Sequence, residues 1–156
     1  MNSLDDIDRR LLASLQDDGR MTNVDLAAKV GLTPPPCLRR VRGLEESGVI
    51  RGYHADLDGA KLGYTITVFA MVSLKSQAED ALRQFEDHMR ALPEVRECHM
   101  LNGEIDFILK IVSRDLQSFQ EFLTSKLTPA PNVASVKTSL TIRTAKQLPG
   151  VPLEDA

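Results

Sequence analysis

The chain has 156 residues, of which 42% are hydrophobic and 26% charged, a composition typical of a globular protein with an apolar core. We expect no membrane span, because no apolar run is long enough, and no signal peptide, because no charged and then apolar segment opens the chain. The net charge of −3 argues against a protein that coats nucleic acid indiscriminately but permits a local basic surface. The two cysteines, Cys37 and Cys98, form no disulfide framework, so we expect a reducing cytoplasm. With no apolar span, we expect no membrane partner.

The first fifty residues carry apolar residues at helical spacing and predict three helices. The apolar stripe of the first helix consists of Ile7, Leu11, Leu12 and Leu15. The second helix begins at Thr22-x-x-Asp25, a candidate capping box, and ends at Gly31. The third helix ends at Gly48. The segment VIRGYHADLD (49–58) then predicts a short strand pair, or wing.

Strands and helices alternate in the second part of the chain. We expect strands in 64–75, 95–101, 105–113 and 133–144. The two helices between them have core stripes formed by Leu82, Phe85, Met89 and Leu92, and by Leu116, Phe119, Leu123 and Leu127. The turn Asn102-Gly103-Glu104 favours a hairpin. The order βαββαβ predicts an α+β, ferredoxin-like sandwich. Its helices cover one face, so we expect a second copy to bury the bare face, which carries alternating apolar residues of 64–74.

The second and third helices have the pattern of a helix-turn-helix. In Leu26-Ala27-x-x-Val30-Gly31-Leu32, Ala27 permits close approach of the next helix and Gly31 supplies the turn. At 100° per residue, the third helix turns an apolar sector inward, formed by Cys37, Leu38, Val41 and Leu44, and turns Arg39 nearly opposite. Many helical hairpins share this pattern, so the basic residues are needed to sharpen the interpretation.

The outward face of the third helix is a candidate DNA-binding surface. The segment from Arg20 to Gly43 contains five basic residues and one acid, and arginine suits guanine edges and phosphates. Gly43 offers a bare backbone, and the prolines offer an apolar edge for a thymine methyl group. The alternative is a merely solvated helix face. The candidate DNA-binding residues are Asn23, Thr33, Pro35, Pro36, Arg39, Arg40, Arg42 and Gly43.

Three consecutive prolines, Pro34 to Pro36, precede this basic face. A residue before proline is pushed toward extended geometry, so we expect the helix to begin at Pro35 or Pro36 and not at Pro34. Prolines at the second and third helical positions have no N–H for a capping hydroxyl. We therefore expect Thr33 to make no ordinary cap and to keep its hydroxyl for another partner.

Several motifs carry a resemblance to a known family. They are Leu4-Asp5-x-x-Asp8, Leu15-Gln16-x-Asp18-Gly19-Arg20, Leu44-Glu45, Gly48-Val49-Ile50-x-Gly52-Tyr53 and Glu97-Cys98-His99-x-x-x-Gly103-x-x-Asp106. Nearly the whole chain resembles the leucine-responsive/asparagine-responsive (Lrp/AsnC) family of transcription regulators. It departs at Pro35, where the family more often has a small polar residue, which leaves the direct contacts of the turn open.

The resemblance implies a DNA-binding regulator with a separate ligand-sensing domain. It implies a homodimer built through ferredoxin-like domains, commonly assembled into octamers, and an effector, usually an amino acid, near the turn between the central strands at a dimer–dimer contact. Carried over by position, the effector-binding candidates are Met100, Asn102, Gly103, Glu104, Asp106, Ser139 and Thr141. Gly103 lets backbone approach a ligand, and Asp106 suits an α-ammonium. The alternatives are a turn-stabilising Asp106 and a Gly103 that serves only the hairpin.

The expected domains are a winged helix-turn-helix domain (1–52), a wing strand and linker (53–63), and a ferredoxin-like effector-binding and oligomerisation domain (64–156). No nucleophile–base pair, phosphate-binding loop or metal-ligand spacing emerges, so we expect no enzyme, no cofactor and no metal site. The rival interpretation is a free-standing amino-acid-binding module or a regulatory subunit of a metabolic enzyme. The basic face of 33–43 discriminates against it. The identity of the effector, the operator and the sign of regulation do not follow from the sequence.

Overall fold

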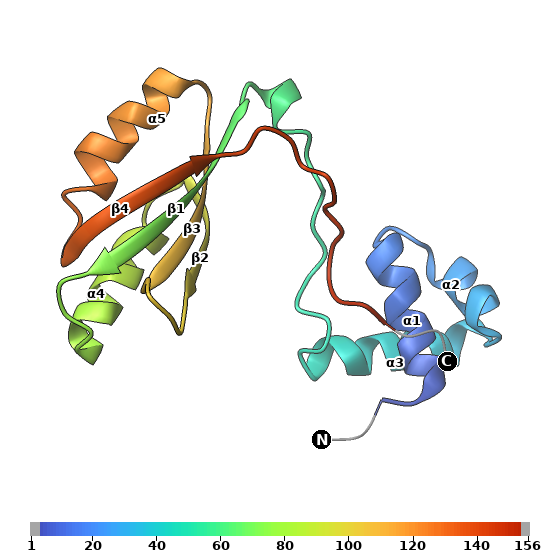
Figure 1. The fold of residues 1–156 in the computed structure, drawn as a ribbon. Helices are drawn as coiled ribbons and strands as arrows, with labels where there is room; N and C mark the ends of the chain where they lie inside the picture. The colour runs from blue at the N-terminus through green and yellow to red at the C-terminus, as the bar shows by residue number, and fades with distance from the viewer. Residues whose placement is uncertain (1–3, 154–156) are drawn as a thin grey trace. The chain divides into compact units, whose positions relative to one another are not determined.

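The computed structural model describes residues 4–153, which form two compact units (Figure 1). One unit contains the residues up to Asp56 together with those from Lys146 onward. The other contains Leu57–Ala145. Each unit has its own cluster of buried apolar side chains.

The first unit is built from three helices, α1 (Asp6–Asp17), α2 (Asn23–Val30) and α3 (Pro34–Glu46). They pack around a small apolar core formed by Leu11, Leu26, Ala27, Val30, Cys37 and Leu44. The predicted stripe of the first helix is confirmed, since Leu11 is fully buried and its neighbours on the stripe pack against the core. The C-terminal stretch joins this unit at Gln16, whose side-chain amide exchanges two hydrogen bonds with the backbone of Val151.

Side-chain caps fix the starts of α1 and α2. Asp5 and Asp8 form a capping box, in which each carboxylate accepts a hydrogen bond from the other residue's backbone N–H. Thr22 caps α2 through a bond from the backbone N–H of Asp25, as the sequence predicts. The reciprocal arm differs from a capping box, because the Asp25 carboxylate accepts from the hydroxyl of Thr22 and not from its backbone.

The strand pair predicted for 49–58 does not form. The structure has no strand between α3 and β1 (Ile66–Leu74), only a short 3-10 helix at Ala60–Leu62. Residues 51–58 are exposed, and a two-stranded ribbon is marginal without a third strand or a packed face. The Tyr53 hydroxyl donates to Glu45 at 2.9 Å. Partial burial and this carboxylate raise the pKa of Tyr53 to about 12.

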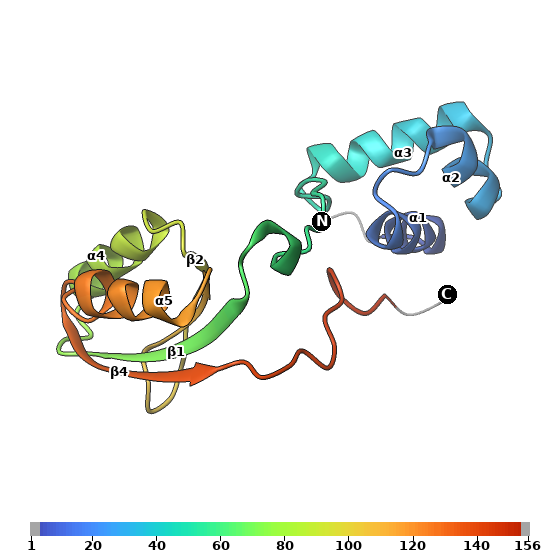
Figure 2. The same ribbon diagram turned by 90° about the horizontal axis from the view of Figure 1, so that it is seen from above.

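The second unit is the predicted βαββαβ sandwich. After β1 come α4 (Glu79–Arg90), β2 (Val95–Met100), β3 (Phe107–Ser113), α5 (Leu116–Phe122) with a π-helical turn at Leu123–Leu127, and β4 (Val133–Leu140). The sheet is antiparallel in the order β2-β3-β1-β4. Both helices lie on one face of it (Figure 2).

The parity of β1 differs from the prediction for the bare face. The apolar residues of the even-numbered positions face the helices and are buried, among them Val68, Ala70 and Val72. The open face carries the odd-numbered positions, with Phe69 38% exposed and Met71 half-buried. The helices select the even-numbered face because its residues are continuously apolar from Ile66 to Leu74, whereas threonine and serine interrupt the other.

One residue of the predicted helix stripes is not in the core. Leu116 is 60% exposed, because it is the first residue of α5 and lies before the part of the helix that packs on the sheet. Phe119, Phe122 and Leu127 are buried there.

Candidate DNA-binding face and effector site

The turn between α2 and α3 has the geometry of a helix-turn-helix. Gly31 adopts the left-handed conformation with φ +76°, which a glycine reaches without steric cost. The N–H of Leu32 donates to the carbonyl of Ala27 at 2.8 Å and closes the end of α2. Ala27 is 1% exposed, so its small side chain lies in the packed contact between the helices. The predicted motif is confirmed.

The helix α3 begins at Pro34, one or two residues earlier than predicted. The first positions of a helix need no backbone donor and want φ near −65°, which proline supplies. This gain outweighs the extended preference of a residue before proline. The first helical bond joins the N–H of Cys37 to the carbonyl of Thr33 at 3.3 Å. Thr33 makes no side-chain capping bond, as predicted.

Two arginines lie open on the outer face of α3. Arg39 and Arg42 are exposed, and neither guanidinium forms an ion pair within the described residues 4–153. A Cβ added at Gly43 meets no atom within 4 Å, so the backbone there is bare. Pro35 is exposed and Pro36 half-buried. This face has the positive charge and the accessibility that a DNA-binding surface requires.

Leu38 does not point inward as predicted. It is 39% exposed, whereas Cys37 and Leu44 are buried. Leu38 lies about 100° from Cys37 around the helix, which places it at the edge of the buried sector. The first two helices leave this edge uncovered. The exposed face of α3 therefore begins with apolar side chains and continues with basic ones.

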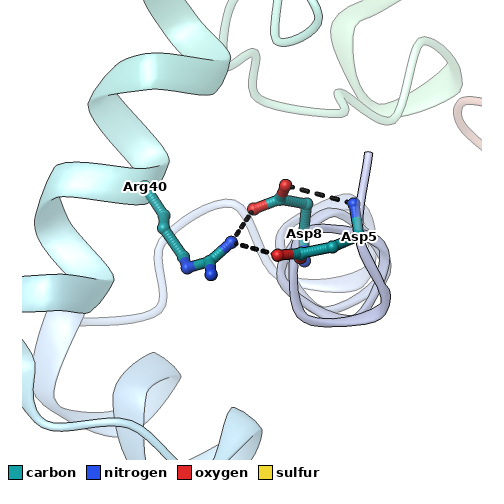
Figure 3. Close-up of polar contacts among 3 residues, drawn as sticks. All are labelled: Asp5, Asp8 and Arg40. Atoms are coloured by element: carbon teal, nitrogen blue, oxygen red, sulfur yellow. Dashed lines mark hydrogen bonds and ion pairs between the residues drawn. The ribbon is translucent and has the colours of Figure 1, made fainter. Parts of the chain in front are cut away.

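Arg40 is held by α1 (Figure 3). One nitrogen of its guanidinium lies 2.8 Å from a carboxylate oxygen of Asp5 and 2.8 Å from one of Asp8. The pKa of Asp5 is lowered, first by the hydrogen bond from the N–H of Asp8 and then by that from Arg40. Arg40 thus ties α3 to the start of α1, and its predicted DNA contact remains a prediction.

Asn23 also joins two helices. Its side-chain N–H donates to the carbonyl of Pro34 at 2.8 Å, which connects the starts of α2 and α3. Its side-chain oxygen is buried and has no partner within the described residues. The sequence predicts Asn23 and Arg40 as DNA contacts and does not indicate that Asp5 and Asp8 pair with Arg40. A pair of acids at a helix start was visible in the sequence, but nothing local joins it to an arginine 32 to 35 residues away.

The hairpin between β2 and β3 carries most of the effector candidates. Met100 is 60% exposed, and Asn102, Gly103 and Glu104 are exposed. The strands pair from Val95 to Met100 against β3, which confirms the hairpin. Gly103 is not among the residues with positive φ, and a Cβ added to it meets no atom within 4 Å. The fold of the single chain therefore does not require a glycine there.

Asp106 has a structural role at the base of this hairpin. Its carboxylate accepts hydrogen bonds from the backbone N–H of Leu74 at 2.7 Å and from the side chain of Gln77 at 2.8 Å. Its own N–H donates to Val72 at 3.0 Å. These contacts agree with the alternative interpretation, in which Asp106 stabilises the turn. A hydrogen bond from an effector ammonium to Asp106 remains a prediction. The remaining lone pairs of the carboxylate could accept it.

Ser139 and Thr141 do not lie near the hairpin in one chain. Ser139 pairs with Phe69 on β1, and the N–H of Thr141 donates to Thr67. The hairpin lies at the other end of the sheet, just beyond the pair that Val72 forms with Phe107. From strand spacing, Thr141 is roughly 16 Å away along the strands and about 10 Å across them. The seven effector candidates can therefore meet only if a second copy contributes some of them.

The cysteines and the possible metal ligands show no arrangement typical of a reactive or metal-binding site. Cys37 is buried, as predicted for a core residue, and Cys98 is free with a pKa raised to about 11, chiefly by burial. No group of three His, Cys, Asp or Glu side chains that could hold a metal occurs in the described part of the chain. None of its helices is long and apolar enough to cross a membrane.

A helix-turn-helix with free arginines, joined to a ferredoxin-like sandwich with an exposed hairpin, defines a DNA-binding regulator with a separate sensing domain. A family model described as a winged helix-turn-helix DNA-binding domain matches residues 4–51, and one described as the Lrp/AsnC ligand binding domain matches residues 67–151. The chain belongs to the Lrp/AsnC family of transcriptional regulators.

Individual relatives support the same family assignment. The leucine-responsive regulatory protein of Rhizobium meliloti is 52% identical over 92% of each chain, and the Bkd operon transcriptional regulator of Pseudomonas aeruginosa is 42% identical over 98% of this chain and 100% of its own. A Neisseria meningitidis transcriptional regulator solved as a complex with L-Met superposes with a TM-score of 0.92 at 35% identity over 97% of each chain. Since these relatives are regulators, the enzyme-subunit and free-standing-module interpretations do not hold.

We predict that Asp5→Asn weakens the acid sensitivity of the first unit. Asparagine keeps the N-cap but removes the charge that Arg40 binds. Because the folded pKa of Asp5 lies below its ordinary value, its carboxylate stabilises the fold fully above about pH 4, and this contribution disappears as the pH falls through the folded pKa. Amide hydrogen exchange in α1 and α3 at several acidic pH values measures the effect.

The matched control is Asp6→Asn, which removes a charge from the same first turn without touching an ion pair within the described residues. It should keep the pH dependence of the parent. Identical profiles for the two variants would show that the Arg40 contact contributes nothing.

Proposed function

We propose that α3 binds specific double-stranded DNA and that an amino acid bound to the ferredoxin-like domain alters the assembly and DNA binding of the protein. The observation that carries the DNA contact is the pair of exposed guanidiniums, Arg39 and Arg42, on the outer face of α3. Arg39 is the best-placed of the two for a base edge, because it lies nearly opposite the buried Cys37. Thr33, Pro35, Pro36 and Gly43 complete the proposed contact.

The proposed effector is an amino acid held at the hairpin. The names of two relatives support this class, since one is leucine-responsive and one was solved with L-Met. Met100, Asn102, Gly103, Glu104 and Asp106 would contact it from one chain. Ser139 and Thr141 would come from another, in keeping with their distance along the sheet. The Thr141 hydroxyl is buried without a partner within residues 4–153, which supports an unfilled contact there.

The proposed assembly is a homodimer through the open sheet face, extended to an octamer. That face exposes Phe69 and half-exposes Met71, Ile108 and Val112, so burying it removes apolar surface from water. Of its two lysines, Lys110 donates to Glu97 at 2.9 Å, whereas Lys137, opposite Met71, is exposed and forms no ion pair within the described residues. The bond from Lys110 also lowers the pKa of Glu97.

The remaining parts of the proposal concern the chain and the cell. Residues 53–63 would connect a DNA-binding domain, residues 1–52, with a sensing domain that begins at residue 64, while the residues from Lys146 onward belong to the first compact unit and not, as expected for 64–156, to the second. The protein would act in the cytoplasm, where its target DNA lies and where the free thiols of Cys37 and Cys98 stay reduced.

We predict that Arg39→Ala weakens specific DNA binding without changing the fold. Its side chain is exposed and makes no packing contact in the core. Loss of a base contact should cost about 1–3 kcal/mol and relax specificity at one position, whereas loss of a phosphate contact weakens all sequences alike. Gel shifts at several salt concentrations measure both. Arg83→Ala, an exposed arginine on α4, removes the same charge and should leave operator affinity unchanged.

We predict that Phe69→Asp converts the dimer to a monomer. A carboxylate on the open sheet face would lose its water in the dimer, and Lys110 directly opposite it is already paired with Glu97, whereas in the monomer the carboxylate stays in water. Light scattering at micromolar concentration measures the mass. Leu116→Asp places the same charge on an exposed residue of α5 and should remain dimeric. A dimeric Phe69→Asp protein would refute this interface.

We predict that Gly103→Ala abolishes effector binding while the protein folds normally. The added methyl group meets no atom of the single chain, so it interferes only if a ligand or a second copy approaches the hairpin. Calorimetric titration with the amino acid identified in a thermal-shift screen measures binding. Gly59→Ala, where a Cβ finds only ordinary contacts at 3.5 Å and beyond, is the control. A Gly103→Ala protein that binds like the parent would place the effector elsewhere.

A further inference from the structure

We propose that the first turn of α3 recognises the 5-methyl group of thymine through an apolar edge formed by Pro35 and Leu38, and not through hydrogen bonds. The inference rests on the proposed DNA contact of α3 and specifies what the beginning of that helix distinguishes.

The first turn of α3 has no backbone donor to offer. Its opening residues Pro34, Pro35 and Pro36 are proline and have no N–H. The next N–H, that of Cys37, already bonds to Thr33. The N-terminus of a recognition helix ordinarily presents such groups to phosphates or base edges. Here that mode of contact is closed, and the carbonyl of Pro34 is also engaged, by Asn23.

The same turn exposes apolar surface instead. Pro35 is exposed and Leu38 is 39% exposed. Residues three apart are neighbours on a helix, about 60° from each other around the axis. Arg39 and Arg42 continue the same outer face toward the C-terminal end. The face therefore has an apolar beginning and a basic continuation, with the polar hydroxyl of Thr33 just before it.

The major groove offers one apolar group that matches this edge. In a helix-turn-helix, the N-terminal residues of the second helix contact base edges in the major groove. Each base pair there presents donors and acceptors, and only thymine adds a methyl group. An edge without donors cannot select a hydrogen-bond pattern, but it can bury a methyl group. A 5-methylcytosine carries that group at the same ring position, so methylation of a cytosine would make it acceptable to this edge.

The first test changes only the DNA. The full-length protein selects its preferred duplex from a random-sequence pool, and each thymine of that duplex is then replaced by deoxyuridine, which removes only the methyl group. A dimer would contact two half-sites, one for each α3. We expect the affinity for DNA to fall about fourfold when uracil replaces thymine at one or two positions of a half-site, as for the loss of one buried methyl group. Replacing such a thymine pair by a C·G pair should weaken binding, and 5-methylcytosine should restore part of it.

The second test assigns the effect to the residues. Pro35→Ala and Leu38→Ala should each reduce the difference between thymine and uracil duplexes at those positions. Arg42→Ala should instead weaken both duplexes by the same factor, and Leu116→Ala on α5 should change neither. Circular dichroism checks that the variants remain helical.

The outcomes separate this inference from the proposed function. If the protein selects no sequence from the pool, the DNA contact of α3 itself is wrong. If it selects a site tightly but uracil is tolerated at every position, the methyl recognition is wrong and the function stands. If the thymine preference persists unchanged in both Pro35→Ala and Leu38→Ala, the recognising surface lies elsewhere.

Discussion

The absence of backbone donors in Pro34–Pro36 sets the geometry on which the proposed DNA-binding face depends. Three prolines can occupy the first turn of a helix and no other part of it, so the start of α3 is tied to one position in the chain. Once the start is set, the helical period brings Cys37 and Leu44 to the core. The side chains of Arg39 and Arg42 then follow on the outer face.

A corresponding constraint acts in the second unit through the parity of the strands. Successive side chains of a strand point to opposite faces, so one choice of face for β1 decides all of them. The even-numbered positions of β1 pack under α4 and α5. On the same buried face, Phe85 of α4 contacts Phe107 of β3, with their ring centroids 4.8 Å apart. The odd-numbered positions, including Phe69, lie on the open face, where we propose that a second copy binds. The outer face of α3 and the open face of the sheet thus each follow from a local rule applied along a whole element.

Charged residues in the family motifs serve the fold as much as the function. Arg40 bridges to Asp5 and Asp8, and Asp106 closes the base of the hairpin through Leu74. Such contacts hold the recognition helix and the hairpin in place, so that the neighbouring groups Arg39 and Glu104 remain available. A substitution at Arg40 or Asp106 would change position as well as charge, which is why residues without such contacts are the better probes of binding.

The sequence by itself determined the presence of the helices, their order with the strands along the chain, and the helix-turn-helix. Each depends on short-range preferences: apolar periodicity, the cap at Thr22 and the left-handed turn at Gly31. It did not determine the exposure of Leu38, the parity of the open sheet face or the partners of Arg40. These depend on how distant segments pack, and a residue at the margin of a buried sector goes either way until its neighbours are placed. The missing strand pair at 49–58 has the same cause, since pairing needs a packed surface that only the tertiary structure provides.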